Sequence, residues 1–275
     1  MESNDFIELS GFHIPRRFFK KIRSHVFLRQ VKPGEIPIFY GIIGPPGSGK
    51  SLQLAQCLAA LKVDVTTLHA SDLASYVEGG ATDLLKNAFQ SASLKVGPAA
   101  LIINDFDLSL ANIKPGVDTS QHTQLLRVAM MEIADQGLVK NSQYAKLPVF
   151  LTINSLDGFY KPLVREGRMR ILRWEMSRDE KKFIVGKIFL ERTEAEIQKL
   201  VSVFDSEQIS FFSALKSEVL IHLAEDAMQE LDGIRQYSAY ELSDIVDEKF
   251  SAVKLGAIVK MGKAVISSRQ SEDYV

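Results

Sequence analysis

The sequence has very little of what an oxidising or membrane environment would require. Only one of its 275 residues, Cys57, is a cysteine, so the chain cannot close an internal disulfide or build a thiolate metal site. It contains no apolar run of the roughly 18–20 residues that a membrane-spanning helix needs. The first residues, Met1–Asp5, show neither a secretory signal nor an arginine-rich transit peptide. We therefore expect a soluble protein of a reducing compartment, with no membrane partner.

An excess of charge of one sign is also missing. The 33 lysines and arginines nearly balance the 34 aspartates and glutamates, which leaves a formal net charge of −1. Such a chain offers no broad positive field to a nucleic-acid backbone, so we expect no nucleic-acid partner. Hydrophobic residues make up 46% of the chain, which is enough to build the core of an ordinary globular protein.

What the chain does have is an alternation of apolar strands and helical patterns in its first part. Because the strands are apolar at nearly every position, they are typical of parallel strands covered by helices on both faces. The alternation predicts crossover connections and an α/β fold in which helices sandwich a parallel sheet. The predicted strands are 36–43, 63–69, 99–104 and 148–154, and the predicted helices are 15–29, 52–61, 82–95 and 121–135.

The pattern changes after Trp174, where helical periodicity continues without comparable strands. The predicted helices of this second part are 177–190, 194–203, 210–231 and 239–252. We therefore predict four regions: an N-terminal helical segment (1–35), an α/β nucleotide-binding domain (36–176), a small all-α domain (177–255) and a C-terminal tail (256–275) that frays.

The strongest motif follows the first predicted strand and precedes a helix. It fits the G-x4-G-K-[ST] pattern of a P-loop at every specified position. In such a loop, backbone N–H groups surround phosphate oxygens, the lysine reaches the β- and γ-phosphates, and the serine hydroxyl ligates Mg²⁺. The sequence therefore predicts an ATPase that uses ATP and Mg²⁺, with the binding residues Gly44, Pro45, Pro46, Gly47, Ser48, Gly49, Lys50 and Ser51.

A second candidate region lies at the end of the strand 99–104. Asn104 and Asp105 follow five apolar residues, and we expect them beside the P-loop at the carboxyl edge of the sheet. Asp105 is the candidate for the indispensable carboxylate, which together with Ser51 would bind Mg²⁺. P-loop enzymes commonly have Asp then Glu here, so the division of labour between Asn104 and Asp105 stays open.

Two further candidates follow. Asn154 ends the next apolar strand, where an amide is able to hold an attacking water or a γ-phosphate oxygen; an ordinary turn asparagine is the alternative. Arg165 and Arg168 lie three residues apart around a glycine. An arginine that reaches a neighbouring subunit's γ-phosphate would stabilise the transition state, and the alternative is a pair of surface arginines.

In this order, these motifs resemble those of AAA+ ATPases, and among them the Rubisco activases. The unusual Asn-Asp pair and the Arg-Glu-Gly-Arg-Met block are specific, whereas the P-loop is shared by many nucleotide-binding families. The matching segments span most of the chain and are Leu101–Asp107, Met130–Asp135, Pro162–Trp174 and Ser210–Leu215.

The resemblance implies a P-loop α/β domain followed by a helical lid domain. It also implies a ring, typically a hexamer, in which Arg165 and Arg168 complete the neighbour's ATP site. The implied activity is remodelling of inhibited Rubisco, which releases tightly bound sugar phosphates. The implied location is the cytoplasm of a cyanobacterial type of cell, or the chloroplast stroma if a transit peptide has been removed.

Some segments depart from the activase pattern. The P-loop is of the general AAA+ type, and Ser75–Gly80 resembles the aromatic pore loop of members that thread proteins, with Tyr76 and Val77 as client contacts. Residues 109–121 replace a glycine-rich loop, and no Rubisco-binding extension follows the lid, so the client stays open. The alternatives are a nucleic-acid loader or initiator ATPase, and a regulatory subunit that hydrolyses ATP poorly because Asn104 precedes Asp105 and no glutamate adjoins it.

Overall fold

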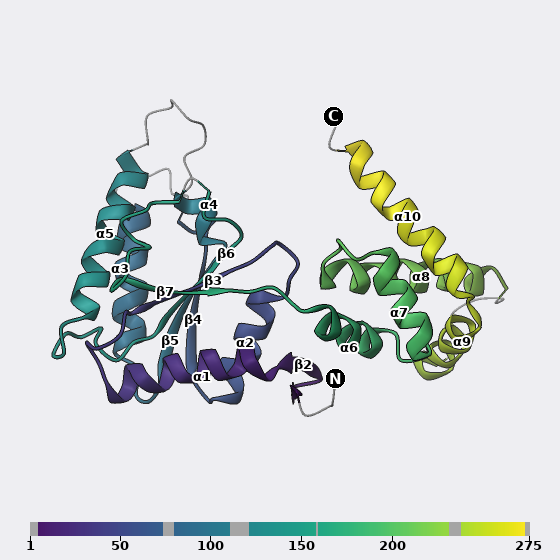
Figure 1. Cartoon of the computed structure of the whole chain (residues 1–275), viewed down its shortest axis with the longest axis horizontal. Helices are drawn as coiled ribbons and strands as arrows, with labels where there is room; N and C mark the ends of the chain where they lie inside the picture. Colours follow the sequence, from purple (N-terminus) through teal and green to yellow (C-terminus); the bar gives the residue numbers. More distant parts are fainter. Residues whose placement is uncertain (1–4, 74–79, 111–120, 158, 231–237, 273–275) are drawn as a thin grey trace. The chain divides into compact units, whose positions relative to one another are not determined.

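The computed structural model describes residues 5–73, 80–110, 121–157, 159–230 and 238–272. The chain forms two compact units, residues 2–175 and 176–275 (Figure 1). The first unit contains the sheet, and the second is built from helices. Among the described residues, none of the helices has both the length and the apolar character needed to cross a bilayer.

A five-stranded parallel sheet forms the centre of the first unit. The strand order is β4-β5-β6-β3-β7, and each neighbouring pair is parallel. The predicted α/β class is therefore confirmed. The strands are β3 (Phe39–Ile43), β4 (Asp64–His69), β5 (Ala99–Asn104), β6 (Val149–Ile153) and β7 (Met169–Arg173).

Two details of the sheet differ from the prediction. The fifth strand, β7, lies outside the four predicted ranges; it pairs with β3 at the edge of the sheet, where alternate residues stay accessible, so its apolar signal is weak. The strand β6 lies between β5 and β3. The acidic strand end therefore sits two strands from the P-loop strand rather than directly beside it.

Helices cover both faces of the sheet (Figure 1). Successive side chains of a strand point to opposite faces, so Phe39 packs edge-on against Phe89, with ring centroids 6.4 Å apart, while Tyr40 packs against His25 at 4.8 Å. All five residues of β3 are buried, as are all five of β6. The covering helices are α1 (Arg16–Val31) and α2 (Lys50–Ala60) on one face and α3 (Gly80–Ser93) and α5 (Gln121–Gly137) on the other.

The N-terminal segment is not purely helical, contrary to the prediction for residues 1–35. Two short strands, β1 (Phe6–Leu9) and β2 (Phe12–Pro15), form an antiparallel hairpin before α1. Its two-residue loop has positive φ at both Ser10 (49°) and Gly11 (79°), the backbone conformation that favours tight hairpins.

The second unit contains the helices α6 (Arg178–Ile188), α7 (Glu194–Val203), α8 (Ile209–Glu230), α9 (Ala239–Ala252) and α10 (Leu255–Glu272). Capping boxes open three of them, because Ser177, Thr193 and Ser238 each accept a bond from the backbone of a glutamate three residues later, and that glutamate accepts one in return. The first four helices lie close to their predicted ranges. The fraying tail predicted for 256–275 is wrong up to Glu272, because α10 buries Ile258 in the core of this unit.

Candidate functional site: a P-loop cleft at the carboxyl edge of the sheet

The P-loop runs from the end of β3 into the first turn of α2. Its start is tied to the sheet, because the Gly44 N–H donates to the Ile153 carbonyl at 3.1 Å. A Cβ at Gly44 would overlap the carbonyl oxygen of Trp174, so the loop requires glycine there. Gly49 has a φ of 81° at the helix N-cap, a conformation that glycine adopts without strain. Since α2 starts at Lys50, the loop ends at a helix N-terminus, which favours an anion.

Lys50 crosses the cleft to Asn154. Its Nζ donates to the carbonyl oxygens of Gly44 (2.6 Å) and Pro45 (2.9 Å) and to Asn154 Oδ1 (2.9 Å). Burial lowers the pKa of Lys50, and the negative charges of Asp105 and Asp107 act in the opposite direction. The ammonium group therefore lies at the meeting point of the P-loop, the β6 end and the acidic segment.

The acidic segment after β5, residues 105–107, is hydrogen-bonded to Asn154, which follows the end of β6. Asp105 has a φ of 52°, and its Oδ1 accepts a hydrogen bond from Asn154 Nδ2 at 3.3 Å. Asp107 Oδ1 accepts from the Asn154 N–H at 3.1 Å, at the start of the short helix α4 (Phe106–Leu110). Asn154 thus joins Lys50 to Asp105, as the carboxyl ends of neighbouring parallel strands allow.

A buried threonine links the remaining polar groups of the cleft. Thr152 Oγ1 accepts hydrogen bonds from Ser51 Oγ (3.4 Å) and from the Asp105 N–H (3.0 Å), and it donates to Asn104 Oδ1 (3.2 Å). The side chain is fully buried in β6. Because it bonds to Ser51 of the P-loop helix and to the end of β5, Thr152 fixes the distance between these two segments.

These groups line an open cleft of about 460 Å³. Glycine and lysine from the P-loop stand on one side, and carboxylate and amide groups on the other. A cleft of this kind combines a phosphate-binding backbone with oxygen and amide groups that are able to hold a cation and a water. Its lining residues are Pro46, Gly47, Gly49, Lys50, Ser51, Leu52, Asp105, Leu108 and Asn154.

Trp174 contacts the P-loop and is hydrogen-bonded to it. Its indole Nε1 donates to the Ser48 carbonyl at 3.3 Å, and its backbone N–H donates to the Ile43 carbonyl. Phe18 packs edge-on against the ring, and the guanidinium of Arg17 lies 4.4 Å from the ring centroid. The first helix of the chain therefore braces the phosphate-binding loop through one aromatic side chain.

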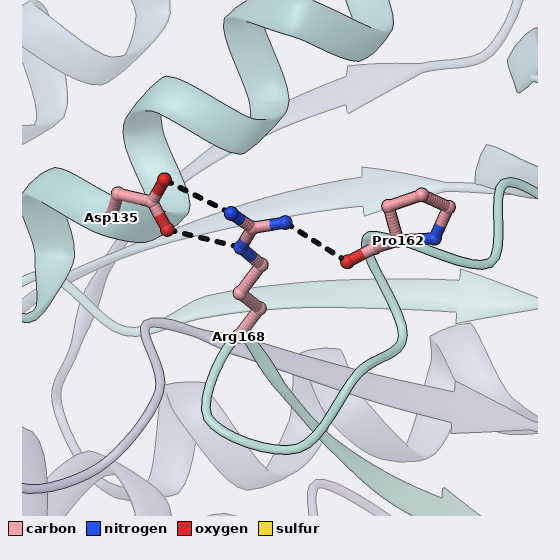
Figure 2. Close-up of polar contacts among 3 residues, drawn as sticks. All are labelled: Asp135, Pro162 and Arg168. Carbon is pink, nitrogen blue, oxygen red and sulfur yellow. Dashed lines mark hydrogen bonds and ion pairs between the residues drawn. The ribbon is translucent and has the colours of Figure 1, made fainter.

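The two arginines of the predicted finger lie in the turn that leads into β7, and their surroundings differ. Arg165 is exposed. Arg168 forms a bidentate ion pair with Asp135, with Nε to Oδ1 at 3.0 Å and Nη2 to Oδ2 at 3.1 Å, and its Nη1 donates to the Pro162 carbonyl at 3.2 Å (Figure 2).

The comparison with protein families agrees with this site. Residues 40–175 match the family described as ATPase family associated with various cellular activities, abbreviated AAA. The chain contains an AAA ATPase domain. The match begins within β3 and ends just after Trp174, so it covers the P-loop, the acidic strand end, Asn154 and both arginines.

Several curated proteins resemble the chain that carries this AAA ATPase domain, and they include three that are named ribulose bisphosphate carboxylase/oxygenase activase. The protein of Nostoc sp. is 28% identical over 96% of this chain and 68% of its own length. The protein of Anabaena sp. is 32% identical over 76% and 54%, and the chloroplastic protein of Chlamydomonas reinhardtii is 27% identical over 95% and 68%. The match thus spans between about half and two thirds of these relatives.

The structure of the AAA ATPase domain brings the P-loop, Asp105 and Asn154 together at one cleft, whereas Arg165 and Arg168 are not among the residues that line it. Tyr76 and Val77, the predicted client contacts, lie outside the described residues. Thr152, Asp107 and Trp174 were not predicted as site residues. A sequence signal exists for Thr152, because it is the polar position of an otherwise apolar strand.

Proposed function

We propose that this chain hydrolyses ATP and uses the energy to remodel a protein client as part of a ring. The observation that carries the proposal is the network that joins Lys50, Asn154 and Asp105 at the mouth of the P-loop. When ATP enters, phosphate oxygens would replace the carbonyl groups that now accept from Lys50. The backbone N–H groups of residues 44–51 would bind the remaining phosphate oxygens.

The residues fit a magnesium ion. Ser51 and Asp105 contribute a hydroxyl and a carboxylate to one cleft, and oxygen ligands are those that Mg²⁺ prefers. In the described part of the chain, no group of three or more His, Cys, Asp or Glu residues is able to hold an ion by itself. Ser51 and Asp105 would therefore share the ion with phosphate oxygens and water. The bound ion would neutralise charge that develops on the phosphates.

Asp105, Asn104 and Asn154 are our candidates for orienting the attacking water. The amide of Asn154 is held from both sides by Lys50 and Asp105, so it is oriented before ATP binds. The amide of Asn104 accepts from Thr152, which fixes its orientation too. Preorganised dipoles of this kind need no reorganisation when charge develops in the transition state.

The ring, its client and its location follow from the resemblance to the activases. We propose a homo-oligomer, most simply a hexamer, in which arginines of the turn before β7 act on the neighbour's ATP. Rubisco is the proposed client, from which inhibitory sugar phosphates would be released, and Tyr76 and Val77 are the proposed client contacts. The proposed location is the cytoplasm, or the chloroplast stroma after loss of a transit peptide.

The first experiment measures ATP turnover of the wild type beside Lys50→Ala and Asp105→Ala. We expect the turnover number of both variants to fall by at least about 100-fold, because each substitution removes a preorganised charge from the cleft. Lys199→Ala, which changes an exposed lysine of α7, is the matched control and keeps full turnover. Turnover retained in both site variants would contradict the site assignment.

The second step tests the client. Rubisco inhibited by its sugar-phosphate substrate is incubated with the protein and Mg·ATP, and recovery of carboxylation is followed. Recovery that requires ATP and an intact Lys50 supports the proposal. ATP turnover without recovery would indicate a different client, or a loader-type ATPase if DNA stimulates it. Nucleotide binding without turnover would indicate a regulatory subunit.

A further inference from the structure

The turn before β7 lies at the surface and is held by backbone hydrogen bonds. Its backbone closes on itself, since the N–H groups of Arg168 and Met169 both donate to the Arg165 carbonyl, at 3.1 and 3.4 Å. Gly167 has a φ of 90°, and a Cβ added there would meet nothing within 4 Å. Glycine is therefore favoured at this position by the backbone conformation and not by lack of space. Leu163 and Met169 anchor the two ends in the core.

Within this turn, Arg168 is committed to its own chain. Figure 2 shows its guanidinium between Asp135 on α5 and the Pro162 carbonyl, with three of its five N–H donors engaged. Two of these bonds form a parallel fork with a carboxylate, the strongest kind of hydrogen-bonded pair at a protein surface. To reach another subunit, Arg168 would have to give up all three bonds and leave Asp135 without its cation.

Arg165 is in the opposite situation. It is exposed, and no ion pair or hydrogen bond of its side chain is found among the residues that the structure describes. Its backbone carbonyl is held by the closure of the turn, so its Cα has a fixed place while its side chain stays available. The turn therefore leaves the guanidinium of Arg165 available to a partner, whereas the guanidinium of Arg168 is bonded within its own chain.

We propose that the two arginines divide the work: Arg165 reaches the neighbouring subunit's ATP, and Arg168 is a positioning residue that Asp135 locks in place. This inference rests on the proposed ring ATPase and refines it, because it replaces a pair of fingers by one finger and its support. Asp135 belongs to α5, which also contacts α4, the helix that follows Asp105. The turn that carries the finger is thus anchored on α5, and α5 contacts α4, whose Leu108 lines the subunit's own ATP cleft.

The test uses mixtures of full-length variants that are each defective alone. Lys50→Ala has a disabled P-loop but an intact turn, whereas Arg165→Ala and Asp135→Asn have an intact P-loop and a disabled turn. We expect Arg165→Ala to lower the turnover number by about 10³-fold or more, as fingers do, and Asp135→Asn to lower it by about tenfold. Both variants should bind ATP with the wild-type affinity, because the substitutions change the turn that acts on the neighbouring subunit and leave the P-loop of their own subunit intact.

Mixing either turn variant with an equal amount of Lys50→Ala should restore turnover. In a randomly mixed ring, about a quarter of the interfaces pair an intact P-loop with an intact turn, so about a quarter of the wild-type turnover per subunit returns. Arg168→Lys, which keeps the charge but cannot form the fork, should behave like Asp135→Asn. Glu166→Gln, the same carboxylate-to-amide change on an exposed residue of the same turn, is the matched control and stays within about twofold of the wild type.

The outcomes separate the inference from the function on which it rests. If the mixture of Arg165→Ala and Lys50→Ala stays inactive, the proposed finger between subunits is itself wrong. If that mixture recovers, two results overturn the positioning role alone. One is turnover within about twofold of the wild type for both Asp135→Asn and Arg168→Lys. The other is a loss that Lys50→Ala does not restore, which would place Asp135 in its own subunit's site.

Discussion

His25 of α1 is a titratable side chain enclosed in the core of the α/β unit. It lies between the rings of Tyr40 and Phe150, and its Nε2 is 3.3 Å from the Ile38 carbonyl. Burial is the main cause that lowers its pKa from 6.5 to about 3, and the positive charges of Arg170 and Arg29 lower it further, against the hydrogen bond to Ile38. The imidazole is therefore neutral in the folded protein at any pH near neutrality.

The lowered pKa of His25 predicts a loss of stability in mild acid. The unfolded chain takes up a proton near pH 6.5 and the folded chain only near pH 3, so the unfolded state gains stability as the pH falls through this window. At pH 5 the cost is about 2 kcal/mol relative to pH 8. Urea unfolding followed by Trp174 fluorescence at both pH values should show this difference in the wild type, and His25→Gln should lack it.

The matched control for His25→Gln is His69→Gln, which removes an exposed imidazole from the same unit. It should keep the acid sensitivity of the wild type, because other titrating groups are unchanged. An equal pH dependence in His25→Gln and the wild type would show that His25 is not the source.

Some residues of the cleft could be predicted from the sequence, and others could not. The P-loop is contiguous, so its spacing alone predicts the contacts of residues 44–51. The bond between Ser51 and Thr152 joins residues 101 positions apart and depends on β6 lying next to β3, which no spacing encodes. The ion pair of Arg168 with Asp135 joins residues 33 positions apart, and no spacing in the sequence indicates that Asp135 bonds Arg168 and not Arg165.

At the level of elements, the predictable helices are those with local start signals. The Ser177, Thr193 and Ser238 capping boxes are visible in sequence, and each marks an observed helix N-terminus. The hairpin of β1 and β2 also had a signal, a Ser-Gly pair between two short apolar segments, but its strands are only four residues long. The helix α10 was not predicted, because the polar residues at the end of the chain favour a frayed tail, although the first half of this segment is apolar enough to pack in the core.

The packing of α10 gives a prediction about two glycines of one helix. A Cβ at Gly262 would lie 2.6 Å from Phe204 Cζ and 3.2 Å from Leu215 Cδ2, and both side chains are buried, whereas nothing lies within 4 Å of one at Gly256. We expect Gly262→Leu to destabilise the helical unit by about 1–3 kcal/mol through overpacking. Gly256→Leu, the same change at a position of α10 with open space around it, should be neutral or stabilising by up to about 1 kcal/mol, because leucine is the better helix former.

Thermal unfolding followed by far-ultraviolet circular dichroism checks the pair of variants. Equal melting temperatures for Gly262→Leu and Gly256→Leu would contradict the close packing of α10.

At the scale of the whole molecule, the sequence-based boundary and the observed division of the chain nearly coincide. The units meet between Glu175 and Met176, directly after Trp174, whose indole bonds the P-loop. The carbonyl of Glu175 also accepts a bond from Arg17 Nη2 at 2.6 Å. The chain thus leaves the α/β unit at a point that is bonded to the first helix and lies next to a residue bonded to the phosphate-binding loop.

A subunit whose ATP site is completed by Arg165 of a neighbour cannot be fully active alone. We therefore expect ATP turnover per wild-type subunit to fall when the protein is diluted from about 10 µM to about 10 nM and the oligomer dissociates. Adding excess Lys50→Ala subunits to the dilute wild type should restore turnover, because they supply Arg165 without hydrolysing ATP themselves. The double variant with Lys50→Ala and Arg165→Ala should assemble equally well, as mass photometry would report, and yet fail to restore turnover. Turnover per subunit that is independent of concentration while the oligomer dissociates would mean that each P-loop cleft is complete within its own chain.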